Sequence, residues 1–173
     1  MKKIKLRALT TTDIEKTLVW HNKEDISDLY LGHPFPVNIE METNWYEKIL
    51  KSNFPVTIFG IEIIESNNLI GITVLMDMNM IYRTAEFAFY IGDQSERGKG
   101  YAKEALILTL RFAFLKLGLQ RIYVKILEEN IQTIKIHEQV GFKKEGILRN
   151  SVFKNGSYKN EQYMAILIEE FHG

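Results

Sequence analysis

The chain has 173 residues, with 22 lysine and arginine residues balanced by 22 aspartate and glutamate residues, and it contains no cysteine. The balanced charge gives no overall attraction to nucleic acid or to an anionic membrane, so neither is an expected partner. The lack of cysteine excludes disulfides, thiolate zinc sites and a cysteine nucleophile. The four scattered histidines form no His-Glu-x-x-His motif, so no metal is expected.

Length and hydropathy predict a single domain and a soluble protein. A chain of this size is typical of a single domain, which we expect over residues 1–173. The N-terminal MKKIKLRAL alternates apolar and polar residues, and no run of eighteen apolar residues occurs anywhere. We therefore expect a soluble, cytoplasmic protein.

The first third begins with a strand and continues as helices. Residues 4–9, IKLRAL, alternate with period two, which predicts a strand. Thr12 lies three residues before Glu15, which is a capping-box spacing and predicts a helix start. After the two prolines of GHPFPVN, Asn38 can cap a further helix over residues 39–50.

From residue 54 the pattern changes to strands and then to alternating helices and strands. Segments rich in β-branched and aromatic residues at 54–64, 69–76 and 83–91 predict an antiparallel meander. The later elements are then a helix (99–117), a strand (119–127), a helix (131–140) and two strands (146–153 and 158–168). Asn130 should cap the second of these helices, and Asn155–Gly156 is a strong hairpin signal. The order predicts an α/β fold with a mixed sheet.

The turn DQSERGKG, between the third meander strand and the long helix, predicts an anion site. Gly98 and Gly100 let the backbone approach a ligand closely, and the following helix directs its free N–H groups and positive dipole end to the same place. Arg97 and Lys99 add mobile positive charge. A tight turn whose charges simply face water is the alternative. Neither a Walker A loop nor a dinucleotide fingerprint fits, because the latter needs a third glycine where Lys103 stands.

In this turn and beyond it, the sequence resembles the GCN5-related N-acetyltransferases (GNAT). AEFAFYIGDQSERGKGYAKEAL resembles the family's central strand, phosphate loop and helix, and EENIQTIKIHEQVGFKKEG resembles its next helix. The closing FKNGSYKNEQYMAIL resembles the branch of ribosomal-protein and spermidine acetyltransferases. The resemblance implies a GNAT fold, with a twisted, mostly antiparallel sheet of about seven strands flanked by helices, and acetyl-coenzyme A as co-substrate. It implies a cofactor site formed by Phe89, Tyr90, Ile91, Glu96, Arg97, Gly98, Lys99, Gly100, Tyr101, Ala102 and Asn130.

Two residues depart from the family pattern. Ser95 stands where the family prefers glutamine or arginine, and His137 stands where many members carry the tyrosine that protonates the leaving thiolate. His137 could replace that acid only if its pKa stays at or above about 6.5, and a half-exposed helix histidine is an equally good interpretation. Tyr90 and Tyr123 are alternative donors, although strand tyrosines more often pack in the core.

Glu86 is the candidate general base. Acetylation needs a neutral amine, and an amine with a pKa of about 10 is protonated at neutral pH. Strand alternation puts Glu86 on the face opposite Phe87 and Phe89, in an otherwise apolar strand, and the resemblance implies a glutamate at this place. A structural ion pair with Arg83, or a solvent-facing position, is the alternative. The backbone of residues 89–93 could pair with pantetheine amides where this strand parts from the strand at 119–127.

Acidic and aromatic residues in the first third and the last hairpin are the candidates for binding the acceptor. Acidic residues between 24 and 42 would suit a cationic acceptor, although solvated helix faces are the commoner explanation; they are Glu24, Asp25, Asp28, Glu40 and Glu42. Aromatic residues that could line a cleft, or pack in the core, are Tyr30, Phe35, Trp45 and Tyr158.

The expected function is direct acetyl transfer from acetyl-coenzyme A to a primary amine in a ternary complex, most simply to a polyamine or diamine. Two alternatives stay open: an N-terminal acetyltransferase of a ribosomal or other protein, and a non-catalytic acyl-coenzyme A sensor, which the histidine at 137 permits. A homo-oligomer is compatible with the branch.

Overall fold

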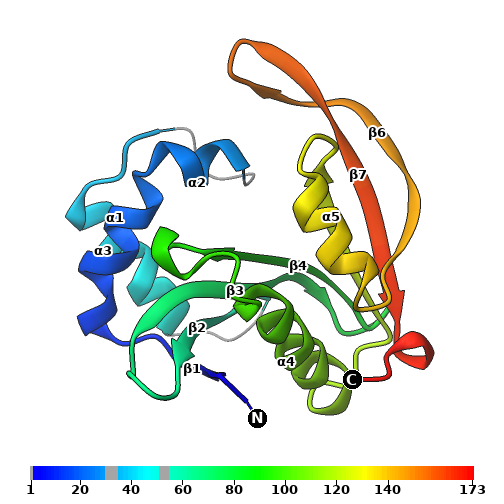
Figure 1. The fold of residues 1–173 in the computed structure, drawn as a ribbon, viewed down its shortest axis with the longest axis horizontal. Helices are drawn as coiled ribbons and strands as arrows, with labels where there is room; N and C mark the ends of the chain where they lie inside the picture. Colours follow the sequence, from blue (N-terminus) through cyan, green and yellow to red (C-terminus); the bar gives the residue numbers. More distant parts are fainter. Residues whose placement is uncertain (1, 30–34, 51–54) are drawn as a thin grey trace.

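A seven-stranded mixed sheet with helices on both faces forms the centre of the protein (Figure 1). The computed structural model describes residues 2–29, 35–50 and 55–173. The strands are β1 (Ile4–Arg7), β2 (Thr57–Ile63), β3 (Leu69–Asn79), β4 (Thr84–Ile91), β5 (Arg121–Leu127), β6 (Lys143–Lys154) and β7 (Ser157–Leu167). Their order is β1-β2-β3-β4-β5-β7-β6, and only β4 and β5 pair in parallel. The predicted fold class is therefore confirmed.

The helices begin close to where the sequence predicts them. They are α1 (Ile14–His21), α2 (Glu24–Leu29), α3 (Ile39–Leu50), α4 (Tyr101–Leu115) and α5 (Ile131–Glu138), with short 3-10 turns η1 (Thr11–Asp13), η2 (Gln94–Glu96) and η3 (Ile168–Glu170). Asn38 and Asn130 act as N-caps: their side-chain oxygens accept the N–H groups of Met41 at 2.9 Å and Thr133 at 3.2 Å. None of the described helices is long and apolar enough to cross a bilayer.

The predicted Thr12–Glu15 capping box is wrong by two residues. The chain first makes the 3-10 turn η1, so the box moves to Thr10 and Asp13. The Asp13 carboxylate accepts the backbone N–H of Thr10 at 2.8 Å and also pairs with Arg7, which donates to it at 2.7 and 2.8 Å. This buried carboxylate therefore ties the start of α1 to the end of β1.

Each face of the sheet packs on a different set of helices. Because side chains alternate along a strand, Phe87 and Phe89 face α4 and α5 together with Leu106 and Ile134, whereas Tyr90 faces the cluster that contains Trp20 of α1. Figure 1 shows α4 and α5 on the side opposite α1–α3. The alternation that the sequence predicts for β4 is confirmed.

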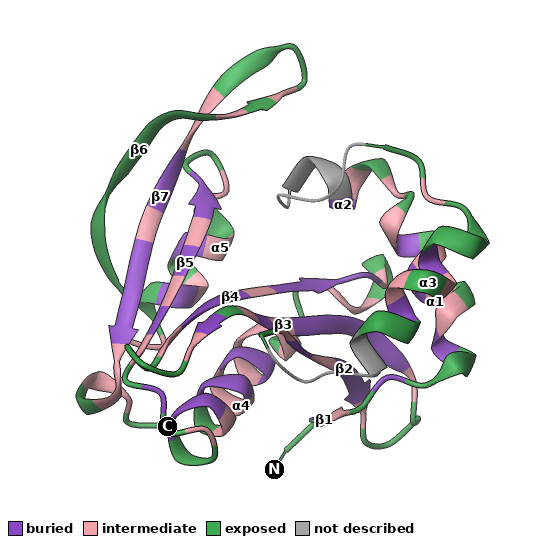
Figure 2. Cartoon of the chain, turned by 180° about the vertical axis from the view of Figure 1, so that it is seen from behind, coloured by how far each residue is buried: buried purple, intermediate pink, exposed green. Residues whose placement is uncertain are grey.

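The sheet splits between β4 and β5. These strands pair only from Thr84 opposite Arg121 to Glu86 opposite Tyr123, and beyond that point they diverge. The predicted parting of these two strands is confirmed. On the far side of the split, β6 and β7 form a long hairpin whose turn residues Asn155 and Gly156 both have positive φ, 48° and 77°. Figure 2 shows that β6 is exposed along most of its length.

Candidate active site

The turn between β4 and α4 presents exposed backbone to a cavity. Gly98 and Gly100 have φ of +77° and +87°, a conformation that other residues rarely adopt, and a Cβ at either position would meet no atom within 4 Å. Gly100 is the N-cap of α4, so the helix starts at Tyr101 and not at Lys99 as predicted. The N–H groups of the first helical turn have no partner within the helix, so they are free to bind an anion.

A cavity of about 420 Å³ opens beside this turn. Its walls come from the end of β4, the turn, the start of α4 and one face of α5: Phe89, Ile91, Glu96, Arg97, Gly98, Gly100, Tyr101, Ala102, Lys103, Asn130, Gln132, Thr133, Lys135, Ile136 and Gln139. Nine of these are predicted cofactor residues. Of the other two, Tyr90 lines the neighbouring cavity, whereas Lys99 is half-exposed and donates to Glu96 at 2.9 Å.

Arg97 is fixed in place, which corrects the prediction that its charge is mobile. Its Nε donates to the backbone oxygen of Ile91 at 2.9 Å, and its Nη1 donates to Asp25 at 2.6 Å. Its remaining nitrogen, Nη2, is buried and has no hydrogen-bond partner within the part of the chain that the structure describes. A buried donor without a partner is costly, so the guanidinium is preorganised for an acceptor that enters the cavity. The residues present therefore fit an anionic ligand.

A second cavity, of about 280 Å³, fills the split between β4 and β5. It shares Phe89, Asn130 and Thr133 with the first cavity, so the two adjoin. Its walls come from both faces of the sheet: Val74, Met76, Glu86, Phe87, Ala88, Phe89, Tyr90, Val124, Lys125, Ile126, Leu127, Asn130, Thr133 and His137. Because the strands have diverged here, a ligand bound at the turn can reach through the sheet to the opposite face.

Glu86 lines this second cavity and is 9% exposed. Lys125 of β5 donates to its carboxylate at 2.9 Å. The ion pair suggested from sequence, with Arg83, is thus replaced by one across the split, and Glu86 does not face solvent. A carboxylate that is both buried and cavity-facing has the position that a proton acceptor needs.

Lys125 of β5 lines the second cavity opposite β4, and the sequence analysis did not predict this. The Lys125 ammonium lies 5.9 Å from the ring centre of Tyr123, and that ring stacks on Tyr163 at 5.5 Å. The hydrogen bond to Glu86 raises the pKa of Lys125, and the nearby Glu161 carboxylate acts in the same direction. Lys125 is therefore positively charged at neutral pH. The available signal was a lysine in an otherwise apolar strand, on the same alternation face as Tyr123.

His137 lines the cavity and is fully buried, which favours its neutral form. It is 0% exposed and lies against Phe87, Phe89 and Phe142, with ring centres 4.8–5.9 Å away. This burial lowers its pKa to about 4. Its Nδ1 lies 2.8 Å from the Thr133 carbonyl, which can only accept, so Nδ1 carries the proton and Nε2 carries the lone pair. The alternative of a half-exposed histidine is therefore wrong, and the general-acid role stays a prediction, which the low pKa disfavours.

The two candidate tyrosines lie on the face opposite α4 and α5. Tyr90 lines the second cavity and packs edge-on against Trp20 at 6.0 Å and His21 at 6.2 Å. Tyr123 stacks on Tyr163, and burial raises the pKa of Tyr123, so its hydroxyl keeps its proton. Tyr90 is the one of the two that lines the cavity between the turn and Glu86.

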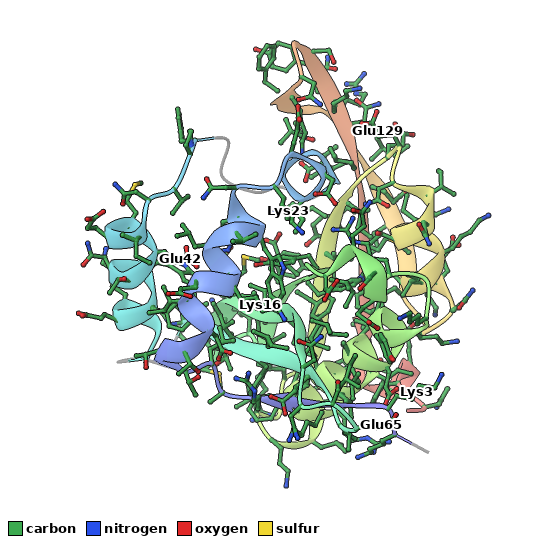
Figure 3. The ribbon with its side chains drawn as sticks, turned by 60° about the vertical axis from the view of Figure 1, so that its left-hand side comes forward. Lys3, Lys16, Lys23, Glu42, Glu65 and Glu129 are labelled. Carbon is green, nitrogen blue, oxygen red and sulfur yellow. The ribbon has the colours of Figure 1, made fainter. Side chains whose placement is uncertain are left out.

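Two of the five acidic residues from 24 to 42, Asp25 and Glu42, are engaged within the protein. Glu42 is 1% exposed, lies between α1 and α3 (Figure 3), and binds Thr17 at 2.6 Å and His21 at 2.7 Å. Asp25 pairs with Arg97. Glu40 is exposed, and Glu24 lies at the start of α2. The side chain of Asp28 falls outside the described part of the chain.

The candidate acceptor-side aromatics are dispersed. Trp45 packs against His21 at 5.3 Å, so it belongs to the helical cluster, whereas Phe35 and Tyr158 are exposed. Tyr158 packs on Phe153 near the tip of the β6–β7 hairpin. Tyr30 lies outside the described residues.

Comparison with known proteins agrees with this geometry. The model of the acetyltransferase (GNAT) domain matches residues 3–143. A spermidine N(1)-acetyltransferase of Vibrio cholerae is 31% identical over 166 residues, which cover 96% of this chain and 94% of that protein. The probable N-acetyltransferase YjcK of Bacillus subtilis is 30% identical over 173 residues, with coverages of 96% and 94%. The crystal structure of the Vibrio cholerae spermidine N-acetyltransferase in complex with CoA and spermine superposes with a TM-score of 0.92 at 29% identity and covers 99% of both chains.

A glycine turn suited to an anion at the start of α4, beside a split sheet with a carboxylate in the gap, fits an acyl-coenzyme A-dependent transferase. The chain belongs to the GNAT acetyltransferase family. It is an N-acetyltransferase, and acetyl-coenzyme A is its co-substrate.

Proposed function

We propose that the protein acetylates a primary amine of a polyamine or diamine by direct transfer from acetyl-coenzyme A. The observation that carries the proposal is the pair of adjoining cavities at the split in the sheet, one lined by the glycine turn and the other by the Glu86 carboxylate. The similarity to a spermidine N(1)-acetyltransferase over nearly the whole chain supports the choice of acceptor.

In this proposal the turn and α4 hold the pyrophosphate. The N–H groups from Gly98 to Ala102 and the free Nη2 of Arg97 supply donors, and the dipole of α4 adds positive potential. Lys103 and Lys135 line the same cavity and add charge. The pantetheine arm then runs past Asn130 and the exposed backbone after Phe89 into the split.

Glu86 would take the proton from the acceptor ammonium. An amine with a pKa of about 10 must lose a proton before its nitrogen can attack the thioester carbonyl. Attack forms the new C–N bond, and collapse breaks the C–S bond and releases a thiolate. The nitrogen also loses a second proton to water, which balances the proton that the sulfur takes up. We propose Tyr90, which lines this cavity, as the donor that returns a proton to that sulfur, because a neutral His137 offers only the Nε2 lone pair. No protein nucleophile is required, so we propose a ternary complex.

The experiment that tests this function is coenzyme A release by the wild-type protein across a panel of acceptors. The panel contains spermidine, spermine, putrescine, and peptides with an N-terminal alanine or an internal lysine. We expect the highest kcat/KM with a polyamine. Preference for the peptides would favour N-terminal protein acetylation, and tight acetyl-coenzyme A binding without any turnover would favour a sensor.

A further inference from the structure

Lys125 occupies the part of the cavity where an acceptor amine has to react. Its ammonium lies 2.9 Å from the carboxylate of Glu86, and both side chains line the cavity in the split. Glu86 is nearly buried, with a side chain 12% exposed, whereas the side chain of Lys125 is 33% exposed. The carboxylate is thus held in the protein, while the lysine reaches it from the open side on a flexible stem.

We propose that the Lys125 ammonium is a resident stand-in for the acceptor, which a substrate ammonium must displace from Glu86 in order to bind. This inference rests on the proposed function, because it assumes that Glu86 receives the acceptor amine. It makes Lys125 a residue that determines acceptor affinity and acceptor chemistry.

The surroundings of Lys125 are those of a cation subsite. The Tyr123 ring, 5.9 Å from its Nζ, stacks on Tyr163, and aromatic faces attract ammonium groups. Glu161 of β7 is 4% exposed, and its Oε1 has no hydrogen-bond partner over residues 2–29, 35–50 and 55–173. A buried carboxylate oxygen without a donor favours a cation nearby. Any ammonium that replaces Lys125 therefore meets the Glu86 carboxylate beside an aromatic ring, in a place where Glu161 also favours positive charge.

Lys125 itself is a poor acceptor for the acetyl group. The hydrogen bond to Glu86 raises its pKa, so it holds its proton and its nitrogen is not nucleophilic at neutral pH. When its ammonium leaves Glu86, the flexible stem can carry it into solvent on the exposed side of the site. An uncharged nucleophile such as an alcohol would not replace the ion pair, so the arrangement selects amines over alcohols.

The test compares acceptor affinity in the wild type and in Lys125→Met, which keeps the length of the stem but removes the charge. Steady-state coenzyme A release with spermidine gives KM and kcat, and calorimetry with spermidine gives the dissociation constant directly. Removal of the competing cation should lower KM and the dissociation constant about five-fold, the size expected for a partly exposed ion pair. Lys125→Arg, which keeps the charge, should bind spermidine no more tightly than the wild type.

Lys5→Met is the matched control. Lys5 pairs with Glu62 at the same 2.9 Å, and the Glu62 side chain is also nearly buried, but neither residue lines the cavity. This variant should leave spermidine binding unchanged. Lys125→Gln also removes the charge and takes the place of the methionine variant if that variant does not fold. Circular dichroism verifies that each protein is folded.

The outcomes separate the inference from the function on which it rests. An unchanged or weaker spermidine affinity in both Lys125→Met and Lys125→Gln, when both are folded, would overturn the inference while leaving polyamine acetylation intact. Lack of turnover by the wild type with any amine would contradict the proposed function instead. In that case calorimetry with spermidine still tests displacement, because it does not require catalysis.

Discussion

Acidification should destabilise the protein through His137. Burial lowers the pKa of this imidazole from 6.5 to about 4. The unfolded chain therefore binds a proton below pH 6.5 that the folded protein does not bind until about pH 4. The contribution of neutral His137 to the free energy of unfolding is fully present above pH 6.5. It falls as the pH drops from 6.5 toward 4, and below pH 4 it does not change further. At 1.36 kcal/mol per pKa unit, the loss is about 3 kcal/mol.

The measurement is urea denaturation at pH 7, 5.5 and 4 for the wild type and for His137→Leu. Other groups also titrate over this range, so the informative quantity is the difference between the two proteins. The free energy of unfolding of the leucine variant should fall by about 3 kcal/mol less than that of the wild type between pH 7 and pH 4. Equal losses in the two proteins would refute the reasoning, because they would mean that His137 is not held neutral by burial.

Three further predictions concern the cofactor turn and the proposed base. Glu86→Gln should lower kcat by about 10² or more, with little change in the calorimetric affinity for coenzyme A; equal losses in both would make Glu86 structural. Gly100→Ala should destabilise the turn by about 1 kcal/mol, because alanine disfavours a φ of +87°, and should weaken coenzyme A binding; unchanged affinity would argue against backbone contacts there. Arg97→Lys keeps the charge but loses the buried Nη2 donor, so coenzyme A affinity should fall several-fold in calorimetry, and more than in Asp25→Asn, which removes only a tether.

Local patterns in the sequence predict much of the fold and part of the site. Period-two alternation in residues 83–91 places Glu86 opposite Phe87 and Phe89, as the structure has it. The caps at Asn38 and Asn130 are also local, because each side chain bonds to a backbone N–H three residues ahead. The left-handed backbone of the turn is also a local feature, because glycine adopts a positive φ more easily than other residues and Gly98 and Gly100 both do so.

Contacts between residues far apart in the chain could not be predicted from local patterns. The Glu86–Lys125 pair exists because β5 lies parallel to β4 in one particular register, and a shift of one residue would turn Lys125 to the other face. The Arg97–Asp25 pair joins the turn to a helix 72 residues earlier in the chain. The low pKa of His137 likewise comes from phenylalanines contributed by β4 and by the segment after α5.

The most direct test of the account is a single-turnover reaction of excess enzyme with isotopically labelled acetyl-coenzyme A and spermidine, followed by mass spectrometry of both the polyamine and the protein. We predict that the label appears on a primary nitrogen of spermidine at the rate at which coenzyme A is released, and that the protein stays unlabelled throughout. Label that passes through the protein at a competent rate, or coenzyme A release without an acetylated polyamine, would contradict direct transfer through the split sheet.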